Sequence, residues 1–344
     1  MFPSSIKIIF RAIGALSVLI CLTSCEIEED DEIMFLRHKG ADMPIWVRGN
    51  VESNVFVLFL HGGPGSTSYI EALSHSFRET EKQYAMVYWD QRASGVSQGK
   101  SSISLLTTDQ FVEDLDLVIR LIEHKYKNAS IFLLGHSWGG LLGTMYLTHH
   151  SPRPSIKGWI EVDGGHNLSQ HAFQLSEEYV LEYANKILSE PLSSKDRKYW
   201  EGAINFYVQT SMWNTSNIVT HETYISKSKG KIYDPDLSFV GINEIFFSEG
   251  DFLAILKQNA QVVENLNIWG VDYTQRLHEI EIPTLVLWGK HDGILPLRLG
   301  IEAKEAYGLA DDLFIVFENS AHNPHLEEPE YFNQVLLKFI KSVL

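Results

Sequence analysis

Cysteine is nearly absent from this chain of 344 residues. Its two cysteines, Cys21 and Cys25, both lie within the first 25 positions. The rest of the chain therefore has no disulfide to stabilise a small core and no thiolate to bind a metal ion. H-E-x-x-H and similar spacings of metal ligands are also missing, so the sequence predicts neither a metal nor another cofactor.

Positively charged residues are also few. The chain has 28 Lys+Arg against 44 Asp+Glu, a formal charge of −16, and no block of basic residues. A nucleic-acid partner is therefore not expected. With 44% hydrophobic and 21% charged residues, the composition is that of a globular protein. The length allows one large core with an insertion, or two domains, and no repeat of 20–50 residues occurs.

The first 25 residues have the pattern of an export signal. Lys7 and Arg11 precede an apolar stretch of about eleven residues, which is too short to span a bilayer. The sequence Leu22-Thr23-Ser24-Cys25 resembles the lipobox of bacterial lipoproteins. That resemblance implies cleavage of a signal peptide over 1–24 and lipidation of Cys25. An ordinary signal peptide and an N-terminal anchor helix are the alternatives.

The segment after Cys25 is acidic. Loss of Lys7 and Arg11 with residues 1–24 changes the formal charge from −16 to −18. The run EIEEDDE then predicts a solvated tether over 25–34. It is similar to the acidic export tags that some Gram-negative bacteria place behind a lipidated cysteine. We therefore expect a protein exported across the inner membrane and lipid-anchored to the cell envelope, on its periplasmic or outward face.

Continuous apolar runs alternate with helical patterns along much of the chain. Runs without polar alternation indicate strands buried on both faces, hence a mostly parallel sheet flanked by helices. The runs are 55–60, 84–89, 130–134, 284–288 and 313–317. An apolar stripe from Phe111 to Ile122 predicts a helix, with Thr107 and Gln110 as its capping box. A final helix is expected over about 329–343.

From 166 to 275 the buried-strand runs stop. The sequence there is aromatic and helix-like, so it predicts an inserted helical cap domain of roughly 110 residues. The predicted organisation is α/β: a core over 35–165 and 276–344, interrupted by the cap over 166–275.

One serine stands in a glycine frame, Gly135-x-Ser137-x-Gly139. This pattern is typical of a nucleophile elbow, a sharp turn between a buried strand and a helix where larger side chains would clash. A strand-like run precedes it and a helix-like segment follows. The turn lifts the hydroxyl above the sheet, and the helix N-terminus favours a developing negative charge.

A serine hydroxyl needs a base, and the base needs an acid. In elbow enzymes the chain order is serine, acid, histidine. Asp292 follows the run 284–288 and His322 follows the run 313–317, at the edge where such sheets hold their chemistry. We predict the triad Ser137, Asp292 and His322. His325 is the rival base, and His136 is expected to point away from the serine and pack beside the elbow.

The segment HGGPG, residues 61–65, follows the first buried run. Its glycines allow the backbone to approach a tetrahedral oxyanion, so Gly63 N–H and Trp138 N–H are the predicted donors. A phosphate-binding loop is the alternative reading, but G-x-x-x-x-G-K-[ST] is absent.

Several motifs together resemble one family. HGGPG (61–65), DQRASGVS (90–97), GHSWGG (135–140), the late Asp292 and SAHNPHLEEPEYF (320–332) are similar to the proline iminopeptidases of the α/β-hydrolase superfamily, peptidase family S33. The resemblance covers about 35–165 and 276–344. It implies the α/β-hydrolase fold, an acyl-enzyme on Ser137 and removal of an N-terminal residue, often proline, from a peptide. The DQR segment, residues 90–92, is expected to brace the loop beside the site.

An aminopeptidase must bind a free ammonium, which calls for carboxylates in the cap. The candidates are Glu177, Glu178, Glu201, Glu244 and Glu249. An esterase, lactonase or amide hydrolase of the same fold remains open, as does a surface lipoprotein that binds a partner without catalysis. Haloalkane dehalogenases and epoxide hydrolases are disfavoured, because they use aspartate where Ser137 stands.

Overall fold

The computed structural model describes residues 32–344, except 75, 151–152, 211–213, 215–216 and 234–260. The predicted signal peptide, Cys25, most of the tether, Glu244 and Glu249 lie outside the described residues. No helix in the described ranges has the length and apolarity needed to cross a membrane.

A single sheet forms the centre of the fold. Its strand order is β1-β2-β4-β3-β6-β7-β8-β9, with the short β5 paired to β2. The strands are β1 (Glu32–His38), β2 (Ala41–Gly49), β3 (Val55–Leu60), β4 (Ala85–Trp89), β5 (Gln98–Gly99), β6 (Ser130–His136), β7 (Ile156–Val162), β8 (Thr284–Gly289) and β9 (Phe314–Phe317). From β4 through β9 every pairing is parallel, whereas β2 runs antiparallel to both β4 and β5.

Helices connect these strands. The α-helices are α2 (Tyr69–Ser74), α3 (Arg78–Glu81), α4 (Thr108–Lys125), α5 (Trp138–His149), α6 (Gln170–Leu188), α7 (Ser194–Gln209), α8 (Ile218–Lys227), α11 (Leu297–Tyr307), α12 (Pro324–Glu327) and α13 (Pro329–Val343). Short 3-10 turns are η1 (Val51–Ser53), η2 (Ile103–Leu105), η3 (Thr274–Glu279) and η4 (Asp311–Leu313). The α/β-hydrolase architecture expected from the sequence is confirmed, helical insertion included.

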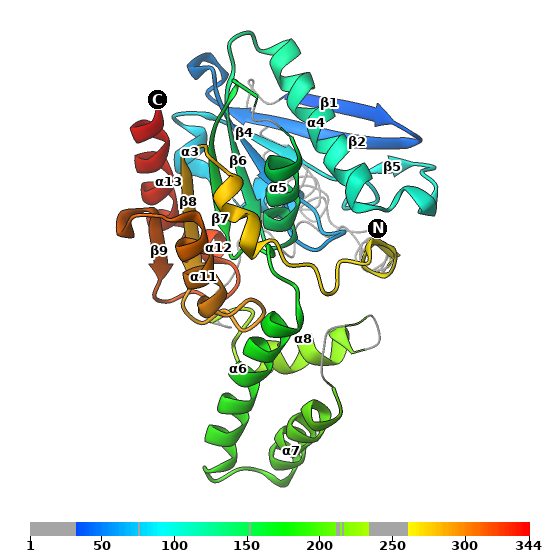
Figure 1. The fold of residues 1–344 in the computed structure, drawn as a ribbon, viewed down its shortest axis with the longest axis vertical. Helices are drawn as coiled ribbons and strands as arrows, with labels where there is room; N and C mark the ends of the chain where they lie inside the picture. The colour runs from blue at the N-terminus through cyan, green and yellow to red at the C-terminus, as the bar shows by residue number, and fades with distance from the viewer. Residues whose placement is uncertain (1–31, 75, 151–152, 211–213, 215–216, 234–260) are drawn as a thin grey trace, which may run out of the picture. The chain divides into compact units, whose positions relative to one another are not determined.

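Both faces of the sheet are buried, because alternate residues of each central strand point to opposite sides. In β3, Phe56, Leu58 and Leu60 join the core under α4 and α5. Val57 and Phe59 join the opposite core, under α3 and α13. Figure 1 shows α4 and α5 on one side of the sheet and α13 on the other. The sheet is thereby fixed as a rigid platform whose parallel strands all end at one edge.

The cap is inserted between β7 and β8. Within the described residues it contains α6, α7 and α8, which Figure 1 shows gathered beyond one end of the sheet. Their apolar faces meet in a core of their own, which includes Phe173, Trp200 and Tyr207 and continues onto Trp288 of β8. An isolated bridge between Asn167 and Asp272 ties the two ends of the insertion together.

Two sequence expectations need correction. The antiparallel strands β1 and β2 were not foreseen, because β1 is only half buried and its residues lack a long apolar run. The capping box on α4 is only half formed. The Thr107 hydroxyl accepts the N–H of Gln110 at 3.3 Å, but the Gln110 side-chain oxygen accepts from the Lys39 ammonium at 2.9 Å instead of from the Thr107 N–H. The charged Lys39 donor makes the stronger bond.

Candidate active site

Ser137 occupies a strained turn between β6 and α5. Its φ of 56° and ψ of −117° lie outside the regions that non-glycine residues favour. A Cβ added to Gly135 would lie 2.4 Å from the Gly139 carbonyl oxygen, and one added to Gly139 would lie 1.8 Å from the Leu60 carbonyl oxygen. Only glycine fits at either position, so the predicted elbow is present, with its serine at the N-terminus of α5.

Asp292 and His322 form the second part of the site. The Nδ1 atom of His322 lies 2.7 Å from Oδ2 of Asp292, and both residues are buried. Asp292 follows β8 and His322 follows β9, two neighbouring parallel strands, so their loops emerge side by side. The two predicted residues, 30 positions apart in the chain, are therefore hydrogen-bonded as the triad requires.

Ser137 borders the same space. A Cβ added to Gly62 would lie 3.2 Å from Ser137 Cβ and 3.1 Å from His136 Nδ1, and the His136 ring centroid is 4.9 Å from that of His322. The Ser137 hydroxyl has no hydrogen-bond partner among the described residues, so the serine–histidine bond is not formed in this conformation. In unliganded enzymes such bonds are often long and tighten only with substrate.

His136 and His325 lie near this site, with ring centroids 4.7 Å apart. The Nε2 atom of His136 donates to the His322 carbonyl oxygen at 2.7 Å. Burial lowers the pKa of His136 well below its usual range, so the ring is neutral and holds the loop that carries His322. His325 is fully buried, stacks on Phe77 and faces Glu71 at 3.5 Å, away from Asp292.

The predicted oxyanion donors lie together. Gly63, with φ of 120°, and Trp138, the first residue of α5, both line the pocket that contains Ser137. In the part of the chain that the structure describes, neither backbone N–H has a protein acceptor. Both are therefore available to a negative oxygen above Ser137.

The DQR segment braces this loop as expected. The Gln91 side chain accepts from the Trp138 indole at 2.8 Å and donates to the His61 carbonyl at 3.2 Å, which joins the HGGPG loop to the elbow. Asp90 accepts from the backbone N–H of Ser68 at 2.7 Å. The buried Arg92 forms a bidentate pair with Asp114, both contacts at 2.8 Å.

A pocket with a cavity volume of about 60 Å³, open at its mouth, adjoins Ser137. Its described walls are mostly apolar and include Leu168, Ile225, Trp269 and Leu295. They come from the start of the cap, from α8, from the end of the cap and from the loop after β8. The pocket therefore favours an apolar group next to the hydroxyl.

The described cap glutamates predicted to bind an ammonium do not lie at the pocket. Glu177, Glu178 and Glu201 do not line this pocket, and Glu178 and Glu201 are exposed. The described carboxylate that does line it is Glu222 of α8, which also lies 3.6 Å from Lys231. Glu222 was missed, although Ile218, Glu222 and Ile225 follow the one-face spacing of a helix.

The cap is bonded to both loops of the acid–base pair. Gly293 N–H donates to the Gly230 carbonyl at 2.8 Å, and His322 N–H donates to the Lys231 carbonyl at 3.3 Å. The Ser176 hydroxyl of α6 donates to the Gly293 carbonyl and lies 3.0 Å from His221 Nε2. The segment at 230–231 thus fixes the positions of the two loops that carry Asp292 and His322 relative to each other.

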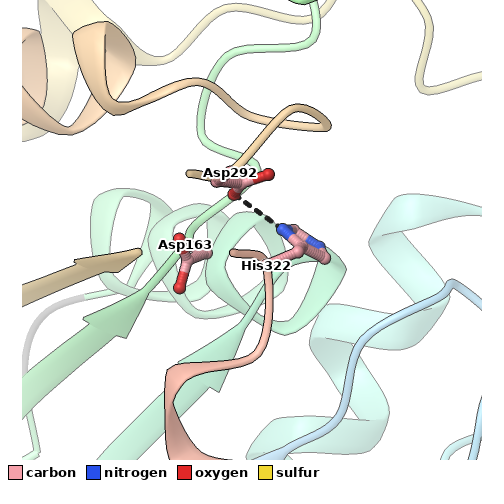
Figure 2. Close-up of side chains that lie close together, drawn as sticks. All are labelled: Asp163, Asp292 and His322. Atoms are coloured by element: carbon pink, nitrogen blue, oxygen red, sulfur yellow. Dashed lines mark hydrogen bonds and ion pairs between the residues drawn. The ribbon is translucent and has the colours of Figure 1, made fainter. Parts of the chain in front are cut away.

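Asp163 is a second acidic residue at this point, and it was not among the residues predicted from the sequence. It directly follows β7, and Asp163, Asp292 and His322 are the described group whose spacing could hold a metal ion. In this structure Asp292 and His322 are hydrogen-bonded to each other. Figure 2 shows the three side chains gathered at one place.

Comparison with known proteins agrees with this geometry. A family model described as "Serine aminopeptidase, S33" matches residues 52–329. The chain belongs to the serine aminopeptidase S33 family. It is a serine hydrolase of the α/β-hydrolase fold.

Relatives of this S33 protein carry related names. "Probable aminopeptidase YbaC" of Bacillus subtilis (strain 168) is 25% identical over 312 residues, which is 87% of this chain and 93% of the relative. A proline iminopeptidase of Clostridioides difficile (strain 630) is 27% identical over 299 residues, 85% of this chain and 92% of the relative. The crystal structure of a proline iminopeptidase of Mycobacterium smegmatis superposes with a TM-score of 0.60 at 16% identity, covering 90% of this chain and 98% of that one.

Proposed function

We propose that this S33 hydrolase is an aminopeptidase that releases an N-terminal residue from peptides through an acyl-enzyme. The observation that carries the proposal is the hydrogen-bonded pair of His322 and Asp292 beside an elbow serine. The names of the relatives support the substrate class. The apolar pocket favours substrates whose N-terminal side chain is apolar, proline included.

The residues of the site have the following roles in this proposal. His322 takes the proton of the Ser137 hydroxyl as the oxygen attacks the scissile carbonyl, and Asp292 orients the ring and stabilises its cation. The N–H groups of Gly63 and Trp138 receive the oxyanion. His322 then gives the proton to the leaving amine, and water, activated by the same ring, hydrolyses the acyl-enzyme.

Glu222 is proposed to bind the substrate's free ammonium. It is the carboxylate among the described pocket walls, and an ammonium needs a charged acceptor in an otherwise apolar site. Because its side chain is 46% exposed, the interaction is partly screened by water. We expect the contribution to be about tenfold in KM, or about 1.4 kcal/mol.

The test is a panel of amino-acid arylamides, with proline, alanine and leucine among them, next to N-acetylated arylamides and simple acyl esters. The proposal predicts cleavage of arylamides with a free amine and Ser137-dependent labelling by a fluorophosphonate. Ser137→Ala should fold like the wild type and lose both. Cleavage of acyl esters with every arylamide left intact would contradict the aminopeptidase assignment.

Glu222→Gln gives a sharper reading of specificity. KM for free-amine arylamides should rise about tenfold, while KM for an acyl ester stays the same. Glu178→Gln is the matched control, because Glu178 is exposed on α6 and does not line the pocket. Equal effects of Glu222→Gln on both substrate classes would argue against ammonium binding.

An esterase is the second candidate. The observation that favours it is the apolar lining, which accepts an acyl chain as well as an apolar amino-acid side chain. The same panel separates the two, because an esterase would prefer acyl esters and ignore the free amine.

We also propose export and lipid anchoring through Cys25, on the sequence pattern alone. Wild-type protein expressed with its signal should partition into detergent with the cell envelope, and Cys25→Ser should release it. Equal partition of the two would overturn the anchor without touching the catalytic proposal.

A further inference from the structure

Asp292 is directly hydrogen-bonded to three donors. Its Oδ1 accepts the backbone N–H groups of Ile294 at 2.8 Å and Leu295 at 3.0 Å, and its Oδ2 faces His322 Nδ1 at 2.7 Å. Three donors directed at one buried carboxylate favour its charged form. The negative charge of this site therefore belongs on Asp292.

Asp163 has an unsatisfied oxygen in the same place. Its Oδ1 accepts the Gly289 N–H at 2.9 Å, but its Oδ2 is buried without a partner among the described residues. Acid or base atoms of Asp163, Asp292 and His322 all lie within 4.8 Å of one another, and Asp163 has no solvent exposure (Figure 2). A second full charge here would have neither water nor a donor on that oxygen.

A protonated carboxyl solves this problem. Two carboxylates sharing a dry site do not both ionise, and the one with fewer donors keeps the proton. Burial, followed by the negative charge of Asp292, raises the pKa of the Asp163 carboxyl well above its usual range. The neutral group becomes a hydrogen-bond donor, and the nearby acceptor is Asp292.

We propose that Asp163 is a positioning residue whose Oδ2 stays protonated and donates a hydrogen bond to the Asp292 carboxylate. No proton is transferred, and the net charge of the pair is −1. Asp163 would hold Asp292 from the side of β7, as His322 holds it from the other loop. The inference rests on the proposed function only in taking the Asp292–His322 pair as the catalytic one.

The backbone at Asp163 makes a matched variant available. Its φ of 42° lies in the left-handed region, where asparagine and aspartate are the best tolerated residues after glycine. Asp163→Asn can accept from Gly289 through its oxygen and donate to Asp292 through its NH₂ group. It therefore copies the protonated acid and cannot copy an ionised one.

The experiment compares wild type with Asp163→Asn, Asp163→Ala and Asp292→Asn. It measures fluorophosphonate labelling and kcat and KM for p-nitrophenyl acetate from pH 5 to 9. Asp163→Asn should stay within about threefold of wild type with the same pH midpoint. Asp292→Asn should lose about 100-fold or more. Asp163→Ala should lose about tenfold in kcat, with its acid limb at higher pH, since Asp292 with one donor fewer holds the imidazolium more strongly.

Loss in Asp163→Asn as large as that in Asp292→Asn would overturn the proposal, because Asp163 would then act as a charge. Wild-type behaviour of a folded Asp163→Ala, pH profile included, would also overturn it. Circular dichroism establishes folding, and if Asp163→Ala does not fold, the Asp163→Asn result decides alone.

Urea unfolding from pH 4 to 7 gives a readout that needs no activity. A protonated Asp163 means that folding takes up a proton, so wild-type stability should fall relative to Asp163→Asn as pH rises. Parallel stabilities would contradict the protonated state. Absence of arylamide cleavage would contradict the aminopeptidase proposal and leave this result unaffected.

Discussion

We predict that the stability of the fold falls at acidic pH because of the buried His221 in the cap. Its ring is buried between α6 and α7, with Nδ1 2.8 Å from the Tyr207 hydroxyl and Nε2 3.0 Å from the Ser176 hydroxyl. Ser176 donates onward to Gly293, so its oxygen accepts from Nε2–H, and Nδ1 accepts from Tyr207. These bonds fit a neutral ring. Burial lowers the pKa of His221 from its usual 6.5 to about 3.

Between pH 6.5 and 3 the unfolded chain binds a proton at His221 that the folded chain does not, so stability falls as pH falls. For those two pKa values the loss from pH 7 to pH 5 is about 2 kcal/mol, or about 25-fold in the unfolding constant. It is fully expressed only below pH 3, beyond the useful range of the assay.

His221→Gln removes the titrating group and keeps one donor and one acceptor. Urea unfolding at pH 5, 6 and 7, followed by tryptophan fluorescence, measures the difference. The variant should lose about 2 kcal/mol less than wild type between pH 7 and 5. His124→Gln, an exposed histidine on α4, is the control and should follow wild type. Parallel curves for wild type and His221→Gln would refute the reasoning, because His221 would then titrate alike in both states.

Three further variants test the frame of the site. Asp114→Ala leaves the buried Arg92 charge uncompensated and should lower the free energy of unfolding by about 3–5 kcal/mol, measured in urea, with kcat of the folded enzyme little changed. His136→Phe should lower kcat for an ester several-fold with KM unchanged, since His322 loses the donor to its carbonyl. Gly139→Ala should yield little folded protein by circular dichroism, because its Cβ would lie 1.8 Å from a backbone oxygen at the end of β3.

Much of the fold could be predicted because its signals are local. Buried parallel strands appear as continuous apolar runs, and β3, β4, β6 and β8 follow the predicted ranges to within two residues at either end. The edge strand β1 gave no such signal, since alternate residues face solvent. A half-buried strand should show alternating apolar and polar residues, but this alternation is hard to recognise in a short segment of mixed composition.

The pairing of Asp292 with His322 could be predicted because chain order and strand ends together select among many candidates. Asp163 satisfies the same rule as Asp292, since it also follows a buried parallel strand. Its role depends on β7 lying next to β8, and the order of the strands in the sheet could not be predicted from the sequence. Glu222 was missed for a similar reason: the face that α8 turns toward Ser137 is set by packing within the cap.

The cap bonds bear on how the site works as a unit. The carbonyls of Gly230 and Lys231 accept from the loops that carry Asp292 and His322, so one short cap segment fixes both halves of the pair. The same cap supplies Glu222 and the apolar wall of the pocket. Movement of this segment would therefore change substrate contacts and the geometry of the base together. For that reason we expect substitutions that loosen the cap to lower kcat as well as raise KM, whereas a pocket without such bonds would show the KM effect alone.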